Sequence, residues 1–106
     1  MNAFDSTLSL CMRARRLVYG FETVKAAVLE GRVALLLTAA DLSPKTRKEV
    51  GYLGAQHGIP HLCLTAAIDG MAHIIGRKTG VIGITDKGFA DRLMLTYNET
   101  EDTLCR

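Results

Sequence analysis

Short apolar runs alternate with helical segments along this chain, and this alternation is the strongest constraint on its fold. Three runs have the length and composition of buried strands, at residues 33–37, 61–65 and 80–85. The segments around them carry apolar residues at helical spacing and residues that cap helices. Strands that alternate with helices are typical of a parallel-rich sheet with helices on both faces. The 106 residues are enough for one such domain.

Capping residues mark the ends of the predicted helices. Asp5-Ser6 is a plausible N-cap of the first, Gly31 ends the second, and Ser43 with Pro44 begins the third. Asp86 caps the last helix. The five predicted helices cover residues 6–18, 21–29, 44–58, 67–75 and 87–97.

The charges are sorted along the chain, although the net charge is only +2. Residues 1–78 carry ten Lys or Arg against six Asp or Glu, whereas residues 79–106 carry three against five. A body with a net charge of +4 is a weak pointer to a polyanionic partner, and chance asymmetry of a solvated surface is an equal alternative. We expect one domain at residues 1–97, followed by an acidic, flexible tail at residues 98–106.

Several classes of protein find no support in the sequence. No apolar run is long enough to span a bilayer, and the N-terminus has no signal-peptide pattern, so we expect a cytoplasmic protein. The three cysteines are odd in number and far apart, which fits reduced thiols and not a disulfide framework. Aromatic residues make up only 6% of the chain, which makes a binder that stacks single strands on aromatic platforms unlikely.

Two patterns that suggest cofactor or metal chemistry are weak. The segment Gly70–Thr79 has five residues between its two glycines, where a phosphate-binding loop has four, and an Arg stands between its second glycine and its Lys. Glycine and proline break any helix between His57 and His61, so these two rings need not share a face, and a metal site that adds Cys63 and His73 to them has no support. We therefore expect no cofactor and no metal.

Basic residues gather at three places that the predicted topology could bring together. In an α/β sheet the loops after the strands meet at one edge, and the free N–H groups of a helix start favour a phosphate. These residues are therefore predicted to form one anion-binding surface. The alternative interpretation is that the charges are scattered over the surface and solvated. The basic residues are Arg13, Arg15, Arg16 and Lys25 around Gly20, then Lys45, Arg47 and Lys48, and finally Arg77 and Lys78.

Three stretches carry a resemblance to a known family. They are residues 13–20, residues 34–43 with Thr46, and residues 76–90, in which the Thr-Asp-x-Gly-Phe-Ala turn that begins at Thr85 is the most specific. Over roughly residues 8–97 the chain resembles the kink-turn-binding ribosomal-protein family, and within it the bacterial YlxQ/YbxF-type branch. The resemblance implies binding to a sharply bent RNA, the kink-turn. It also implies a three-layer α/β/α sandwich, which we expect to hold a mixed, mostly parallel central sheet of about four strands.

The resemblance also implies particular RNA-binding residues. In that family a Gly-x-Asn-Glu-x-x-Lys signature at the start of the second helix contacts tandem sheared G·A pairs. Glu22 and Lys25 match its Glu and Lys, and Gly20 lies one residue out of register. Phe21 stands at the Asn position and can neither donate nor accept, which would forfeit about 1–3 kcal/mol of discrimination. The loop at residues 76–80, apolar and close to a flipped-out base in the family, is basic here.

We therefore predict a small RNA-binding protein of ribosomal-protein type that performs no reaction. Its partner would be structured RNA, a kink-turn or ribosomal RNA, on the ribosome or its assembly intermediates, with no membrane and no small-molecule substrate. The expected RNA-binding residues are Arg16, Gly20, Phe21, Glu22, Lys25, Lys45, Lys48, Arg77 and Lys78.

Two alternatives from other classes remain open at this point. One is a protein-interaction module on the same fold that has lost kink-turn binding and presents Phe21 as an exposed anchor. The other is an enzyme built around His61 and Cys63. The fold alone does not decide among them, because unrelated functions share folds.

Overall fold

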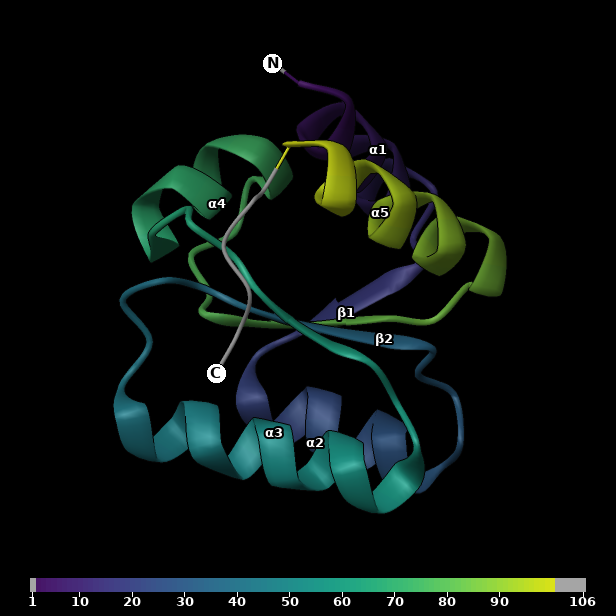
Figure 1. The fold of residues 1–106 in the computed structure, drawn as a ribbon, viewed down its shortest axis with the longest axis vertical. Helices are drawn as coiled ribbons and strands as arrows, with labels where there is room; N and C mark the ends of the chain where they lie inside the picture. Colours follow the sequence, from purple (N-terminus) through teal and green to yellow (C-terminus); the bar gives the residue numbers. More distant parts are fainter. Residues whose placement is uncertain (1, 101–106) are drawn as a thin grey trace.

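The computed structural model describes the backbone of residues 2–100 and the side chains of residues 2–97. Figure 1 shows α2 and α3 on one face of a central sheet and α1, α4 and α5 on the other, so the predicted three-layer sandwich is confirmed. The elements are α1 (Ala3–Arg13), β1 (Leu17–Tyr19), α2 (Phe21–Leu29), β2 (Leu35–Thr38), α3 (Pro44–His57), β3 (His61–Cys63), α4 (Ile68–Ile75), β4 (Val81–Ile84) and α5 (Lys87–Thr100).

The predicted boundary at residue 97 does not coincide with a helix end. Helix α5 continues through residues 98–100, and the rest of the predicted acidic tail, residues 101–106, lies outside the described residues. None of the helices in the described part of the chain is long and apolar enough to cross a membrane.

The four strands form one mixed sheet, as predicted, and their order is β1-β4-β2-β3. The expected parallel majority is wrong. Only β2 and β3 are parallel, whereas β4 runs antiparallel to both β2 and β1. The reason is the short connection through α4. Cys63 and Val81 both pair with Thr38, so α4 joins two strand ends at the same edge instead of returning the chain across the sheet.

The sequence prediction missed β1 and extended the first helix through it. Helix α1 ends at Arg13, and Arg15 adopts a left-handed conformation with φ of 58°. The amides of Arg15 and Arg16 donate to the carbonyls of Met12 and Cys11, which closes the helix end and reverses the chain. A non-glycine residue in this conformation carries no sequence signal, because glycine is the usual marker.

The start of the first helix also differs from the prediction. The side chain of Asn2, rather than Asp5-Ser6, caps α1 and accepts a hydrogen bond of 2.8 Å from the Asp5 amide. The other predicted helix signals are confirmed. They are the Ser43 cap on Thr46, the Asp86 cap on Phe89, and the left-handed glycines Gly31, Gly58 and Gly76.

Two cores fill the layers above and below the sheet. Leu35 and Leu37 of β2 face α1, α4 and α5, while Leu36 between them faces α2 and α3. All three leucines are fully buried, which explains why the central strand reads as a continuous apolar run. Both faces of β2 are thus covered, and its one polar residue, Thr38, is fully buried as well.

His61 begins β3 and makes stability depend on pH. Burial and then the charge of Arg47 lower its pKa, and its Nε2 lies 2.8 Å from the Thr38 hydroxyl. Between the lowered pKa and the ordinary value of 6.5, the unfolded chain binds more protons than the folded chain. We therefore expect the free energy of unfolding to fall as the pH drops below about 6.5 and to level off below the pKa of folded His61.

Urea unfolding of wild type and His61→Asn at pH 7.5 and at lower pH measures this effect. The variant should be less stable at neutral pH, because it loses the hydrogen bond to Thr38, but its stability should fall less between the two pH values. The other histidines are present in both proteins and cancel in the comparison. Equal slopes for the two proteins would contradict the assignment.

Candidate functional site

The sheet brings three helix starts and one loop to the same edge. Strands β1, β2 and β3 end there and β4 begins there, because Tyr19 pairs with Ile82 and Thr38 pairs with both Val81 and Cys63. The chain therefore enters α2, α3 and α4 from this edge, at the left of Figure 1. The loop at residues 76–80 lies among them, since it leads directly into β4.

Gly20 joins the start of α2 to that loop. Its amide donates to the carbonyl of Val81 at 3.0 Å and to Oγ1 of Thr79 at 3.2 Å. Its φ of 88° is a conformation that side chains disfavour. Gly20 is also the N-cap of α2, and no side chain caps this helix. The first amides of α2 are thus left for a ligand, with the positive end of the helix dipole behind them.

Arg77 is held at the same edge of the sheet, on the face that carries α4. Its Nε donates to the hydroxyl of Tyr19 at 3.0 Å, and its Nη1 donates to the carbonyl of Gly76 at 3.2 Å. Tyr19 is the last residue of β1, and its ring packs on the core beneath α1, α4 and α5, so the guanidinium is held on that face of the sheet, opposite to α2. Lys78 is directed toward α4, where its Nζ lies 3.4 Å from Asp69 with both side chains largely exposed.

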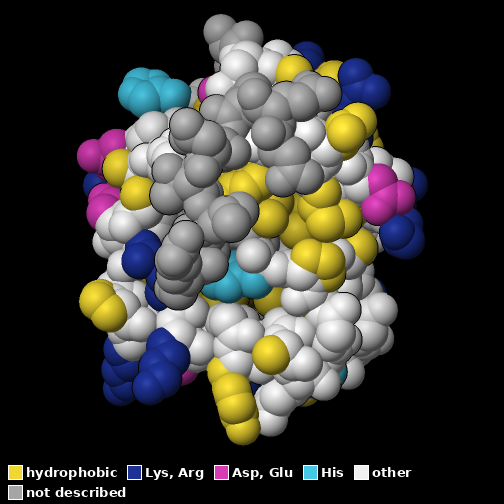
Figure 2. Space-filling view, viewed as in Figure 1, with side chains coloured by type: hydrophobic (Ala, Val, Ile, Leu, Met, Phe, Trp, Pro, Cys, Tyr) yellow, Lys and Arg dark blue, Asp and Glu magenta, His cyan; other side chains and the backbone are white. Residues whose placement is uncertain are grey.

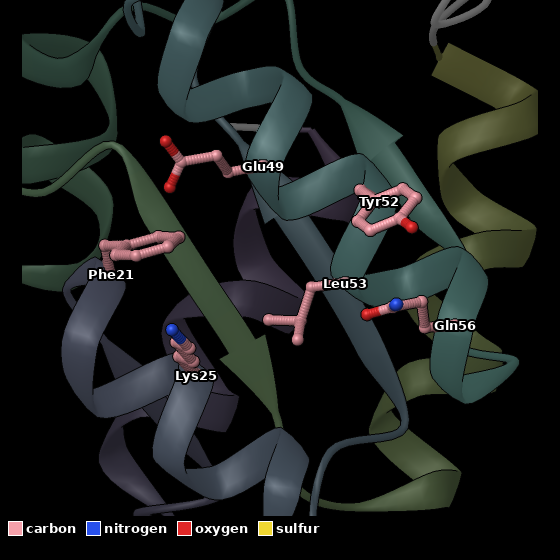
Figure 3. Close-up of a pocket in the computed structure, with 6 residues that line it drawn as sticks. All are labelled: Phe21, Lys25, Glu49, Tyr52, Leu53 and Gln56. Carbon is pink, nitrogen blue, oxygen red and sulfur yellow. The ribbon is translucent and has the colours of Figure 1, made fainter.

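A hollow lies between α2 and α3, and we call it the α2–α3 hollow. Figure 3 shows side chains of α2 facing side chains of α3 across it. The ring of Phe21 is half-buried and packs against the core below the sheet, so Phe21 is not the exposed anchor that the protein-interaction alternative required. The lining residues are Phe21, Lys25, Glu49, Tyr52, Leu53 and Gln56.

The basic residues at the start of α3 divide into two groups. Lys45 and Lys48 are exposed, and they line a second hollow together with Glu49 and Tyr52. Figure 2 shows Lys and Arg side chains gathered at the lower left, over the start of α3. Arg47 instead turns back, and its Nη2 donates to the carbonyls of Ala39 and Ala40 at 2.9 and 2.6 Å. Arg47 thus fixes the loop before α3, while the two lysines face solvent.

The structure brings most of the expected residues together, but not Arg16. Gly20, Phe21 and Glu22 form the α2 start, Lys25 lies one turn further along α2, and Arg77 is held at the same edge on the other face of the sheet. Lys45 and Lys48 occupy the neighbouring helix, with Lys78 on the side of α4. The carbonyl of Arg16 accepts from the Thr85 amide, which places this residue at the opposite edge of the sheet.

Sequence reasoning missed two residues that organise this edge. Tyr19 holds Arg77, and Thr79, which is buried, bonds to Gly20 and to both polar backbone groups of Val81. Tyr19 was missed because the first helix was predicted to extend to residue 18, so no strand was expected to end at Tyr19. A polar residue flanked by glycine two positions before a strand was the only available signal for Thr79.

The cluster around His61 does not assemble further chemistry. Its Nε2 lies 3.9 Å from Sγ of Cys63, and Thr38 is the nearer partner. Cys63 is disulfide-bonded, so the expectation of reduced thiols is wrong for this residue. Cys11 is a free, buried thiol, and burial followed by the charge of Asp86 raises its pKa to about 12. Among the residues that the structure describes, no group of three or more His, Cys, Asp or Glu could hold a metal.

Comparisons with known proteins point to one family. The sequence profile described as "Ribosomal protein L7Ae/L30e/S12e/Gadd45 family" matches residues 2–94. A protein of Bacillus subtilis (strain 168) named "RNA-binding protein YlxQ" is 30% identical over 92 residues, which cover 82% of this chain and 87% of the relative. A protein of the same name from Enterococcus faecium is 29% identical over 85 residues, or 80% of this chain and 82% of the relative.

Solved structures agree with this match. A protein of unknown function from Bacillus halodurans C superposes with a TM-score of 0.89 at 29% identity, over 92% of this chain and 99% of the other. The 15.5kD RNA binding protein of Giardia lamblia superposes with a TM-score of 0.75, over 92% of this chain and 83% of the other. At 14% identity the second likeness concerns the fold alone.

Proposed function

Because this chain belongs to the ribosomal protein L7Ae/L30e/S12e/Gadd45 family, we propose that it binds structured RNA at the sheet edge where α2 begins. Both YlxQ relatives are named RNA-binding proteins. The uncapped start of α2, which Gly20 ties to the basic loop at residues 76–80, is the observation that supports this location best. Uncapped helix amides and a fixed guanidinium, that of Arg77, are both suited to phosphate oxygens, and the two lie at the same edge of the sheet.

We further propose that the RNA is a kink-turn or a similarly bent element. Glu22 and Lys25 lie on the first turns of α2, three residues apart on one helix face. A carboxylate accepts from exposed base amines, and an ammonium donates to guanine N7 and O6 or to phosphate. Base edges are accessible to such groups where a helix is distorted, because a regular RNA duplex hides them in a deep, narrow groove.

Phe21 sets this site apart from the family signature. Its ring lies in the α2–α3 hollow and packs on the core, so the position offers no hydrogen bond to a base. The shape of the RNA and the phosphate contacts of Arg77, Lys45 and Lys48 therefore carry a larger share of recognition. No step of catalysis is part of this proposal. Ribosomal RNA or an assembly intermediate in the cytoplasm would be the setting for such a role in translation.

A competition between two RNAs at two salt concentrations tests the proposal. We expect a kink-turn RNA to bind more tightly than a plain duplex of equal length, and to keep that advantage at the higher salt concentration. Binding to the duplex should collapse with salt, since it rests only on counterion release. Filter binding or fluorescence anisotropy gives both affinities. Equal affinities that fall together with salt would mean that the interaction is only electrostatic and that specific recognition is absent.

A further inference from the structure

Tyr52 is an exposed aromatic residue of α3 that belongs to neither of the two cores. It lies in the middle of α3, and its side chain is 68% exposed. It lines both the α2–α3 hollow and the second hollow beside it, so it stands between the two. Tyrosine is enriched at contacts with partners, because its ring offers apolar area and its hydroxyl offers a hydrogen bond.

The charges around Tyr52 favour a polyanion. Lys48 precedes Tyr52 by one helical turn, Lys45 by two, and Lys25 faces the same hollow from α2. In the described part of the chain none of these three lysines forms an ion pair. A negatively charged strand that runs along α3 could therefore be neutralised without breaking any existing interaction.

Two polar side chains flank the ring and differ from the lysines in what they can bind. Glu49 and Gln56 lie one turn before and one turn after Tyr52 and line the α2–α3 hollow with it (Figure 3). A carboxylate repels phosphate but accepts hydrogen bonds from a base edge. Guanine suits Glu49 best, because its N1–H and N2–H₂ groups present two neighbouring donors to the two carboxylate oxygens.

The two surfaces are continuous. Phe21 and Lys25 belong to the α2 start and also line the α2–α3 hollow. We infer that an unpaired nucleotide next to the bent RNA, preferably a guanosine, stacks its base on Tyr52 while Lys45 and Lys48 neutralise its phosphates. This inference rests on the proposed function, because it assigns a second contact to the same RNA. The inference needs only one aromatic ring for stacking, so it is compatible with a chain that is poor in aromatic residues.

Kink-turn RNAs with and without a short unpaired overhang test the inference. Each overhang has about four unpaired nucleotides, one of which is a guanosine. A set of RNAs carries this overhang at each strand end in turn, which identifies the strand that reaches α3. We expect one overhang to raise wild-type affinity by about fivefold, the lower end of the range for stacking of one base on an aromatic ring. Tyr52→Ala should lose that gain and bind the RNA without an overhang as wild type does.

Two matched variants separate stacking from other contacts. Tyr52→Phe should keep the gain, because the ring remains, whereas Tyr52→Leu should lose it although the position stays apolar. Replacing the guanosine by 2-aminopurine gives a second readout, since its fluorescence should be quenched on wild type and not on Tyr52→Ala. If no overhang raises the affinity, or if Tyr52→Leu keeps the gain, the inference is wrong. If wild type does not prefer the RNA without an overhang to a plain duplex, the proposed function itself fails.

Discussion

A Gly54→Ala protein should be less stable than wild type by about 1–3 kcal/mol, even though alanine is the better helix former. A Cβ at this position would lie 2.9 Å from the carbonyl oxygen of Ile59 and 3.1 Å from Cδ1 of Leu36. The first contact is with backbone, and that backbone is itself held by the Ile59 amide, which donates to the carbonyl of Gly54 at 2.8 Å. The turn after α3 would have to move away from the helix.

Gly51 provides the matched control, because it lies on the same helix one turn earlier. A Cβ there would meet the His61 ring, with Nδ1 at 3.6 Å and Cε1 at 3.9 Å, which are ordinary contacts. Gly51→Ala should therefore raise stability by up to about 1 kcal/mol through helix propensity. Urea unfolding of both variants measures the two free energies. Changes of the same sign would show that the approach of α3 to the turn at residue 59 is looser than the distances indicate.

A Lys25→Ala protein should bind a kink-turn RNA about 10- to 100-fold more weakly than wild type. The loss is expected to be larger than one screened surface charge can produce, because the lysine stands beside Glu22 at the open start of α2. The discrimination between the kink-turn and a plain duplex should shrink with it. Anisotropy titrations of both RNAs at one salt concentration give the affinity for the kink-turn and its ratio to the affinity for the duplex.

Lys87→Ala is the control for that experiment. Lys87 begins α5 after β4 has ended, at the opposite edge of the sheet, where it pairs with Asp91 at 2.9 Å. Its removal changes the net charge by the same amount and should leave kink-turn affinity nearly unchanged. If both variants lose the same affinity, the charge of the whole protein attracts the RNA and the α2 start has no special role.

The local parts of this fold could be predicted from the sequence because each has its own chemical marker. The bounds of α2 and the Ser43-Pro44 start of α3 agree with the prediction, and Gly31 and Gly58 end their helices as expected. The apolar runs of β2 and β4 became strands for the same reason, since burial on both faces leaves a continuous apolar pattern, whereas β3 is a half-buried strand at the end of the strand order.

The direction and number of strands depended on contacts that no local pattern contains. Strand β1 has only three residues and follows a turn closed by Arg15, so nothing distinguished it from helix. The antiparallel placement of β4 follows from where α4 lies on the sheet, which is a tertiary property. The geometry of the site could not be predicted for the same reason, because the hydrogen bonds from Arg77 to Tyr19 and from Gly20 to Thr79 join segments about sixty residues apart.

The order of strands has a consequence for synthesis of the protein. Strand β4 lies between β1 and β2, yet it is the last of the strands to be made. A growing chain that has emerged only as far as β3 can pair β2 with β3, but β1 has no neighbour and Gly20 has no Val81 or Thr79 to bind. The sheet edge thus closes near the end of translation, in keeping with domains that fold as units. Any RNA that this edge holds meets a finished molecule and not a nascent one.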